Sequence, residues 1–558
     1  MLWIGVPAVF VLAFWFYVNA GISRVAVYEW GDWASTGMDA FRARHFNQYL
    51  GTYSSRLLFR HPGPLQAYLS AASESLLCGL FHFQSPHAAH VFGTAFYTLC
   101  FNFASFYVLF RLLNHKQLLI PAYIWIFCLQ NTILQNQLSV LAQHNMSIPA
   151  LTLLCLTTAA LVSGRIWCLP LFALAATTCG LLHTFNATHV VVLTAIALSG
   201  LIYRKLRLGE GLFTRQNRRY LLLAAGIVAV GAFPVMYDQF FLTHNLSKIL
   251  SFIRSNKLLE ASGGASSHLG LVLRYIPAFF VSMFWGQEAS MKLAVDRQFA
   301  VSVQGAVVFW SLFCTFTAVA LIKVHDILIR TLTVLVVIGM FLVAQFSIAN
   351  GTFDMEVYGR NLYGYVAVLG LVILLIADRY AREFAAGRPR TSVPRNYTRR
   401  TAGWVLIVST LALSIFPMVA FPDSKHFFNT PRSFGYAQRQ LERGYFDVQA
   451  WLSTDPRVGE ITDAVIRNGG PQNASIALFL DKTGDWTEVF SVLLQLVRQH
   501  RTVCVVDKQN SGLVGVIMGN EFVCTEPSDV DIYVADKPIP DGKQIYANGY
   551  YVAVMSRP

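Results

Sequence analysis

The chain alternates long apolar runs with short polar segments along most of its length. A transmembrane helix needs about 20 predominantly apolar residues to cross the hydrocarbon core of a bilayer. About eleven runs approach or meet that length: residues 2–19, 89–111, 117–136, 147–163, 166–184, 187–203, 219–237, 303–323, 330–349, 361–378 and 403–421. The pattern predicts a polytopic α-helical membrane protein.

Two further apolar segments are interrupted by polar residues. Residues 64–82 contain Glu74 among several serines, and residues 270–286 contain Arg274 and Pro277. Amphipathic segments of this kind suit helices that lie along the membrane interface. We therefore predict two interfacial helices there, rather than two further spans.

The distribution of positive charge predicts the orientation, because short loops rich in Lys and Arg stay on the cytoplasmic side. The three most basic short linkers are residues 203–220, 323–330 and 378–400. All three fall on one side only if neither interrupted segment spans the membrane. The N-terminus is then cytoplasmic, and the loop 20–88 and the C-terminus lie on the outer face.

The composition changes at about residue 421. Residues 1–421 hold the apolar runs, whereas residues 422–558 have the mixed composition of a soluble domain. Short apolar runs there predict strands, and an amphipathic run predicts a helix, which together indicate a small α/β domain. The predicted strands are 474–480, 502–507, 529–536 and 549–556, and the predicted helix is 486–500. We expect this domain on the periplasmic side, where it binds the acceptor or caps the outer loops.

Composition and charge agree with a membrane protein. Only 13% of the 558 residues are charged and 55% are hydrophobic, whereas about a quarter of the residues in soluble domains are charged. The net charge of +13 is concentrated in the linkers, as membrane topology requires. We therefore expect membrane lipids, and no nucleic acid, as partners.

The nine cysteines lie mostly in the apolar runs, where a thiol behaves as a small hydrophobic side chain. Cys504 and Cys524 lie in the polar C-terminal part. In an oxidising compartment such a pair can form a disulfide, and two buried thiols are the alternative. No Cys/His spacing indicates a zinc site, and the sequence leaves open whether a divalent metal is needed.

The loop after the first apolar run is rich in ionisable residues. The stretch EWGDWAS places Asp32 between two tryptophans, and Trp favours the membrane–water interface. A carboxylate at that depth is costly unless it has a partner or a function. The same loop carries Arg56, Arg60 and His61 before a Pro-Gly-Pro turn. A plain polar loop whose arginines reach lipid phosphates is the alternative interpretation.

Asp32 in GDWAS, followed by GTYSSRLLFRHPGPLQAYL (51–69), resembles the first outer loop of the GT-C glycosyltransferases. That superfamily includes protein mannosyltransferases, aminoarabinose transferases and arabinofuranosyltransferases, and the likeness is greatest to bacterial multi-spanning members. HNMSIP (144–149) and LLHTFNATH (181–189) also resemble outer helix ends of the family. One departure from the family pattern is the additional serine in YSSR.

The resemblance implies an inverting enzyme of the bacterial inner membrane. It would take a sugar from a polyprenyl-phosphate donor and place it on a glycan, lipid-linked glycan or protein acceptor at the outer face. The acceptor hydroxyl must lose a proton as it attacks, and one carboxylate can take that proton. The leaving lipid phosphate gains negative charge, which guanidinium groups stabilise.

These requirements give each candidate residue a predicted role. Asp32 is the predicted catalytic base, and Asp39 and Glu29 are secondary candidates. The predicted donor-phosphate ligands are Arg56, Arg360 and Arg60, and the predicted substrate-binding residues are His61, Tyr53, Asn145, His183 and Asn245.

Two other classes of protein remain as alternatives. A transporter or flippase of lipid-linked sugars would place charges or broken helices near the bilayer midplane, whereas the charges here flank the apolar runs. A non-catalytic assembly protein of cell-envelope glycan synthesis would use its C-terminal domain as a partner surface. An inert Asp32→Asn variant of normal abundance would separate the enzyme from both.

Overall fold

The structure is a computed structural model of the full chain. It describes residues 32–54, 59–83, 86–123, 125–126, 143–184, 186–209, 214–254, 273, 276–277, 303–322, 324–349, 360–386, 456–468, 474–480, 486–508, 512, 514–524, 530–535, 537–538, 542–547 and 551–555. The predicted spans 2–19 and 403–421 lie outside these residues, as do most of 117–136 and of the predicted interfacial helix 270–286.

The contacts divide the chain into two compact units. The first unit comprises the described residues of 96–137 and 142–431, and the second comprises those of 18–95 and 432–558. Helix α4 (Pro86–Leu112) is continuous and contributes residues to both units.

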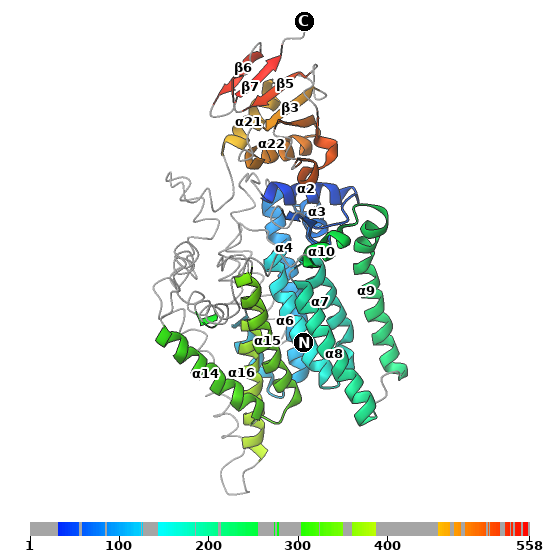
Figure 1. The fold of residues 1–558 in the computed structure, drawn as a ribbon, viewed down its shortest axis with the longest axis vertical. Coiled ribbons are helices and arrows are strands. Elements are labelled where there is room, and N and C mark those ends of the chain that lie inside the picture. Colours follow the sequence, from blue (N-terminus) through cyan, green and yellow to red (C-terminus); the bar gives the residue numbers. More distant parts are fainter. Residues whose placement is uncertain are drawn as a thin grey trace. The chain divides into compact units, whose positions relative to one another are not determined.

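The first unit is a bundle of apolar helices (Figure 1). Besides most of α4, its described elements are η2 (Lys116–Leu118), α6 (Gln143–Val162), η3 (Ile166–Cys168), α7 (Leu169–Leu182), α8 (Asn186–Leu208), α9 (Arg215–Phe241), α10 (Asn245–Arg254), α14 (Val303–Ile322), α15 (Ile327–Ala349) and α16 (Arg360–Ala386).

Helix α6 forms the centre of the bundle, where it packs against α7, α8, α15 and α16. Every side chain from Met146 to Leu161 is buried. This stretch includes Thr152 and Thr158, whose hydroxyls donate to the carbonyls four residues earlier at 3.0 and 2.7 Å. Both hydroxyl groups therefore have hydrogen-bond acceptors within the helix, so threonine can occupy these two interior positions without a buried unpaired hydroxyl.

Four helices in the described part of the chain are long and apolar enough to cross a membrane: Pro86–Leu112, Asn186–Leu208, Asn217–Phe241 and Gly364–Arg382. Shorter apolar helices include Met146–Val162, Ile166–Leu182, Ala306–Ile322 and Ile327–Val343. Each of these eight overlaps a predicted span. Helix α9 exposes large apolar side chains such as Val230 and Phe233, as expected of a helix that faces lipid. The chain is therefore a multi-pass membrane protein, and the count of about eleven crossings remains a prediction.

The interrupted segment 64–82 forms α3 (Leu65–Leu77), a helix of 13 residues. At 1.5 Å per residue it is about 20 Å long, less than the hydrocarbon core of about 30 Å. Its length thus agrees with the interpretation that this segment does not span the membrane.

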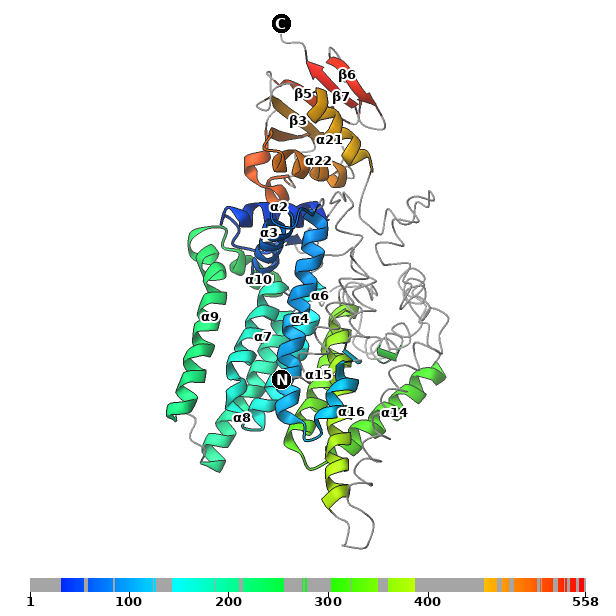
Figure 2. The same cartoon turned by 180° about the vertical axis from the view of Figure 1, so that it is seen from behind.

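The second unit combines the described loop after the first apolar run with a mixed sheet (Figure 2). Besides α3 and the start of α4, its elements are α2 (Asp32–Arg44), β1 (Tyr53–Ser54), β2 (Phe59–Arg60), α21 (Pro456–Asn468), β3 (Ser475–Leu480), α22 (Trp486–Arg498), β4 (Thr502–Asp507), the π-helix η6 (Val514–Met518), η7 (Asn520–Phe522), β5 (Ile532–Ala535), β6 (Gly542–Ala547) and β7 (Tyr551–Met555).

The five-stranded sheet has the order β4-β3-β5-β7-β6. Strands β4, β3 and β5 are parallel, and β7 and β6 add to them in antiparallel fashion. Helix α22 connects β3 to β4 and packs against both strands, which is the crossover that a parallel pair requires. The four strands and the helix expected from the sequence each fall on an observed element, whereas α21 and β6 were not expected.

The apolar core of this unit includes residues from the loop as well as from the sheet. Ala34 and Met38 of α2 are fully buried in one cluster with Phe490 of α22 and Leu478 of β3, and Phe41 packs against that cluster. Positions 34, 38 and 41 follow the i, i+4, i+7 spacing of one helix face. The apolar face of α2 is therefore buried against the C-terminal helix and sheet, and the division into domains at residue 421 remains a prediction.

Cys504 of β4 and Cys524 form a disulfide, with their Cα atoms 5.8 Å apart. The backbone N–H of Cys524 also donates to the carbonyl of Val505 at 3.1 Å. The bridge therefore fastens the segment after η7 to the edge strand of the sheet.

We expect this disulfide to stabilise the second unit by about 3 kcal/mol, because it closes a loop in the unfolded chain. The double variant Cys504→Ala/Cys524→Ala should lose that amount in denaturant unfolding of the purified protein. Peptide mass analysis after alkylation without reductant checks the bridge itself, and alkylation of both cysteines would exclude it.

Candidate functional site

A short hairpin in the loop carries several of the predicted site residues. Strands β1 and β2 are antiparallel, with Tyr53 opposite Arg60. Backbone hydrogen bonds between Gly51 and His61 extend the pairing, since the Gly51 N–H donates to the His61 carbonyl at 2.9 Å. The hairpin thus brings Tyr53, Arg60 and His61 onto one small element beside α2.

Asp39 of α2 is the buried acceptor around which this region is organised. Its Oδ1 accepts hydrogen bonds from Nη1 of Arg60 at 3.0 Å and from Nε2 of Gln48 at 3.1 Å. Arg42, one turn further along the helix, places its Nη1 3.8 Å from the same oxygen. Only 1% of the Asp39 side chain is exposed, so these partners compensate for the burial of its charge.

The second carboxylate oxygen of Asp39, Oδ2, is buried and accepts no hydrogen bond from the residues that the structure describes. Buried polar atoms of this kind are uncommon in folded proteins. One oxygen of Asp39 thus accepts hydrogen bonds from Arg60 and Gln48, and the other has the capacity to accept a further one.

Both terminal nitrogens of Arg60 donate hydrogen bonds. Nη1 also donates to the carbonyl of Gly51 at 3.2 Å, and Nη2 donates to the carbonyls of Val516 and Ile517 at 2.9 and 3.0 Å. The last two carbonyls belong to η6, so Arg60 connects the hairpin and α2 to the C-terminal part of the second unit. Its guanidinium makes these internal contacts, and its role as a phosphate ligand remains a prediction.

His61 is buried, and burial lowers its pKa to about 4. The imidazole is therefore neutral at pH 7 and can take part in hydrogen bonds without contributing a positive charge. A Cβ on Gly51 would lie 2.8 Å from the carbonyl oxygen of Gly63 and 3.0 Å from the Cβ of His61. Glycine at position 51 permits this close approach of the hairpin to the Pro-Gly-Pro turn.

A second buried charge cluster lies on α3. Oε1 of Glu74 accepts from Arg44 at 3.1 Å, and Oε2 accepts from Arg498 at 3.2 Å and lies 3.1 Å from Nε2 of His90. Burial by itself would raise the pKa of Glu74, but Arg498, His90 and Arg44 outweigh it and lower the pKa to about 2. One carboxylate thus joins α2, α3, α4 and α22.

The first unit carries its own buried polar cluster, at the ends of helices that contain HNMSIP and LLHTFNATH. Nδ2 of Asn186 donates to Oγ of Ser147 at 2.7 Å. The hydroxyl of Tyr365 lies 2.6 Å from Nδ1 of His189. His183 ends α7, is buried, and accepts a hydrogen bond from the Asn186 N–H at its carbonyl. Ionisable side chains buried in a membrane bundle are candidates for a functional role.

Asn245 opens the amphipathic helix α10 and is buried. Its backbone N–H donates to Oδ2 of Asp238 at 3.0 Å, and Oδ1 of the same carboxylate accepts from Thr243. Asp238 therefore fixes the turn between α9 and α10, and Asn245 with it.

The remaining predicted residues are described in part or not at all. Asp32 is the first residue of α2, Arg360 is the first residue of α16, and Asn145 lies in the first turn of α6; for these three the structure gives the place in the chain fold alone. Arg56 and Glu29 lie outside the described residues.

Sequence reasoning did not find the partners that organise the site. Gln48 lies in a segment without a distinguishing pattern, and Arg498 lies in the predicted amphipathic helix 486–500, whose pattern does not identify its partner. Glu74 did carry a signal, since it is the one charged residue in the sequence of α3. Among the residues that the structure describes, no group of three or more His, Cys, Asp or Glu side chains is arranged to hold a metal ion.

The chain combines a bundle of apolar helices with a second unit that contains a mixed sheet. This combination places it in the class of multi-pass membrane proteins that carry an additional unit of helices and strands. Within that class, the chain shares its fold with ArnT, as seen in the crystal structure of ArnT from Cupriavidus metallidurans bound to undecaprenyl phosphate. The TM-score is 0.50 and the sequence identity 11%, over 99% of this chain and 97% of that chain. The resemblance predicted from GDWAS and residues 51–69 is therefore confirmed at the level of the fold. No protein-family model matches the chain, and no curated protein matches it.

Proposed function

We propose that the chain is an inverting glycosyltransferase of the GT-C type. It would move a sugar from a polyprenyl-phosphate donor to an acceptor at the outer face of the inner membrane. The observation that supports this most directly is the shared fold over 99% of the chain with a protein crystallised with undecaprenyl phosphate.

Asp32 remains the proposed catalytic base. It begins α2, and this helix is anchored by the buried side chains of Ala34 and Met38 and by the ion pair between Asp39 and Arg60. A base on an anchored helix loses little freedom when substrate binds, which favours catalysis by positioning.

The proposed reaction is a single displacement at the anomeric carbon. The acceptor oxygen forms the new C–O bond and its proton passes to the carboxylate of Asp32, while the bond from the anomeric carbon to the phosphate oxygen breaks. The leaving polyprenyl phosphate takes the bonding electron pair and gains negative charge. Arg56 and Arg360 are the proposed phosphate ligands, because a guanidinium matches phosphate geometry with two parallel hydrogen bonds.

Asp39 and Arg60 are better assigned to positioning than to direct catalysis. Their mutual 3.0 Å contact and the carbonyl bonds of Arg60 lock the hairpin, which carries His61 and Tyr53, to α2, the helix that begins with the proposed base. His61 is neutral, so we propose that it hydrogen-bonds to the sugar or the acceptor. Asn145, His183 and Asn245 remain proposed substrate-binding residues.

The purified protein incubated with a panel of polyprenyl-phosphate sugars tests the function. A transferase releases polyprenyl phosphate and produces a glycosylated acceptor or, slowly, free sugar. A flippase moves the intact donor across proteoliposome membranes without cleaving it, and an assembly protein does neither. Parallel reactions with a chelator and with added Mg²⁺ or Mn²⁺ determine whether a divalent metal is needed.

We expect cysteines introduced near residues 210 and 390 to react with a membrane-impermeant thiol reagent only after the cell is opened, because both lie in basic linkers that favour the cytoplasm. A cysteine introduced near residue 540 should react in intact spheroplasts. Labelling of position 390 from outside would overturn the proposed orientation.

A further inference from the structure

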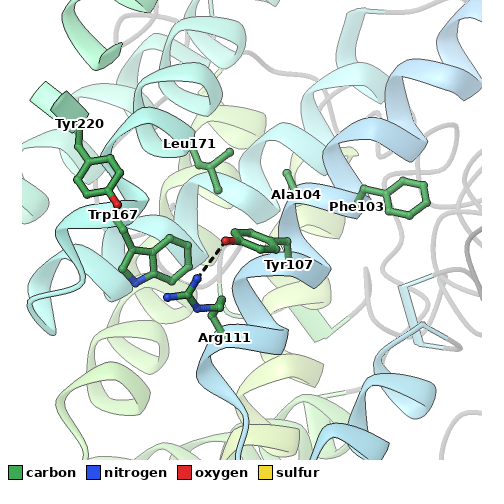
Figure 3. Close-up of a pocket in the computed structure, with 7 residues that line it drawn as sticks. All are labelled: Phe103, Ala104, Tyr107, Arg111, Trp167, Leu171 and Tyr220. Atoms are coloured by element: carbon green, nitrogen blue, oxygen red, sulfur yellow. Dashed lines mark hydrogen bonds between the residues drawn. The ribbon is translucent and has the colours of Figure 1, made fainter. Parts of the chain in front are cut away.

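The helix bundle contains an open cavity of about 490 Å³ that the proposed reaction does not use. It lies between α4, η3, α7 and the start of α9 (Figure 3). Phe103, Ala104 and Leu171 contribute purely apolar side chains to the lining, and Tyr107, Trp167, Tyr220 and Arg111 contribute polar or cationic groups. Along α4 the lining changes from Phe103 and Ala104 to Tyr107 and Arg111.

Among the described residues of the lining, Arg111 is the one charged group, and it is well placed to receive an anion. Its Nη1 donates to the hydroxyl of Tyr107 at 3.1 Å, and its Cζ lies 4.9 Å from the centroid of the Trp167 ring. The two aromatic rings meet edge to face with centroids 5.7 Å apart, so they hold the guanidinium in place (Figure 3). Within the described residues Arg111 makes no ion pair with a carboxylate, which leaves donors available for a ligand.

The surroundings of Arg111 are basic. Arg165 adjoins η3, and Arg204 of α8 lies against Gly164, within 2.7 Å of where a Cβ on that glycine would stand. The carboxylate of Asp378, which contacts the linker after α4, is already used by Asn114 and by His115, whose Nδ1 lies 2.7 Å away. The local charge therefore favours an anionic ligand over a neutral or zwitterionic one.

The chemical gradient of the cavity matches a lipid at the membrane interface. Trp, Tyr and Arg are typical of the headgroup region of a membrane, and apolar side chains are typical of the acyl-chain region. Phe103 and Arg111 are eight positions apart on α4, which corresponds to about 12 Å along the helix axis. This distance suits a phosphate at one end and the upper part of an acyl chain at the other.

We propose that this cavity binds one anionic glycerophospholipid, with its phosphate against Arg111 and Tyr107 and one acyl chain along Phe103 and Leu171. The basic linkers nearby assign it to the cytoplasmic leaflet, where anionic lipids attract juxtamembrane Lys and Arg. Such a lipid would cover the cavity between α4 and α9 and so fix the position of α9 on the bundle. The proposal does not depend on the transfer reaction.

Native mass spectrometry of the full-length protein in detergent tests the site, with phosphatidylglycerol, phosphatidylcholine, undecaprenyl phosphate and inorganic phosphate as separate probes. We expect one phosphatidylglycerol to bind at least about 10-fold more tightly than phosphatidylcholine, and inorganic phosphate not to bind. Arg111→Gln should weaken the binding of phosphatidylglycerol by about 10-fold, as expected for loss of one charge-assisted contact. Trp167→Ala should also weaken it, and Arg111→Lys should restore part of the affinity.

Arg207→Gln is the matched control, because it removes the same charge from an exposed position in the last turn of α8, outside the cavity. It should leave the affinity within about twofold of wild type, as expected for a screened surface charge. Equal binding of phosphatidylcholine, an Arg111→Gln variant that binds like wild type, or an equal effect of Arg207→Gln would overturn the proposal. Preferential binding of undecaprenyl phosphate that is lost in Arg111→Gln would instead assign the cavity to the polyprenyl carrier.

Discussion

Replacing Asp32 with Asn should reduce turnover by about 10²-fold or more while leaving donor binding almost unchanged. Asparagine keeps the shape of the side chain but cannot take the acceptor proton, and a general base typically contributes about 10²–10⁴-fold. The measurement is a single-turnover rate together with a separate donor-binding constant on a verified substrate, so that chemistry and binding are resolved.

The proposed phosphate ligands provide the contrast for that result. Arg56→Ala or Arg360→Ala should weaken donor binding as well as slow turnover, because a phosphate contact exists in both the ground state and the transition state. Lysine at either position should rescue only in part, since an ammonium lacks the planar fork of the guanidinium. Near-normal turnover in Asp32→Asn would remove Asp32 as the base and leave Asp39 or Glu29 as the next candidates.

Replacing Glu74 with Ala should cost about 3–5 kcal/mol in unfolding free energy, because it leaves the buried guanidinium of Arg498 without its counter-ion. The effect should include detachment of α3 from α22, seen as faster limited proteolysis after residue 44. Asp463→Asn is the matched control. Its carboxylate is 52% exposed and pairs with Arg467 four residues later, and such surface pairs contribute about 0–1 kcal/mol.

The same carboxylate should make stability depend on acid pH. The pKa of Glu74 falls from 4.5 in the unfolded chain to about 2 in the folded protein, so the unfolded chain binds the proton first as the pH falls. The contribution is complete above about pH 5 and is lost on the way to pH 2; it amounts to about 3 kcal/mol. His61 adds a separate loss between pH 6.5 and about 4, since its folded-state pKa is also lowered. Glu74→Gln should abolish the lower transition and keep the upper one, as measured by unfolding midpoints across this range.

Most helices and strands could be predicted because their side chains repeat with a clear period. The run SIALFL gave β3 and the run TVCVVD gave β4 almost to the residue. The sequence did not predict strand β6 (GKQIYA), which lies at the sheet edge. Exposed lysine and glutamine at an edge protect against pairing with another chain, and here they interrupt the alternation of apolar and polar residues. The sequence did not predict helix α21 for a related reason, since charged residues interrupt its apolar positions.

The loop could be recognised as the candidate site, but its internal arrangement could not be derived. Local sequence showed that Asp32, Arg60 and His61 share one segment. The pairing of Glu74 with Arg498 joins residues 424 positions apart, and nothing in either neighbourhood specifies the other. Arg60 illustrates the same limit, because its role depends on two carbonyls of η6 that lie more than 450 residues further along the chain.

The burial of Ala34 and Met38 in one cluster with Phe490 has a consequence for folding during synthesis. Helix α2 is made before the surface that covers its apolar face, since Phe490 of α22 lies more than 440 residues further along the chain. At about 5–20 residues per second, the helix waits roughly 20–90 s for its partner, with every intervening helix inserted in the meantime. The nascent chain therefore carries an uncovered apolar helix face during that interval, and we expect the membrane surface or a chaperone to shield α2 until α22 and the sheet are made.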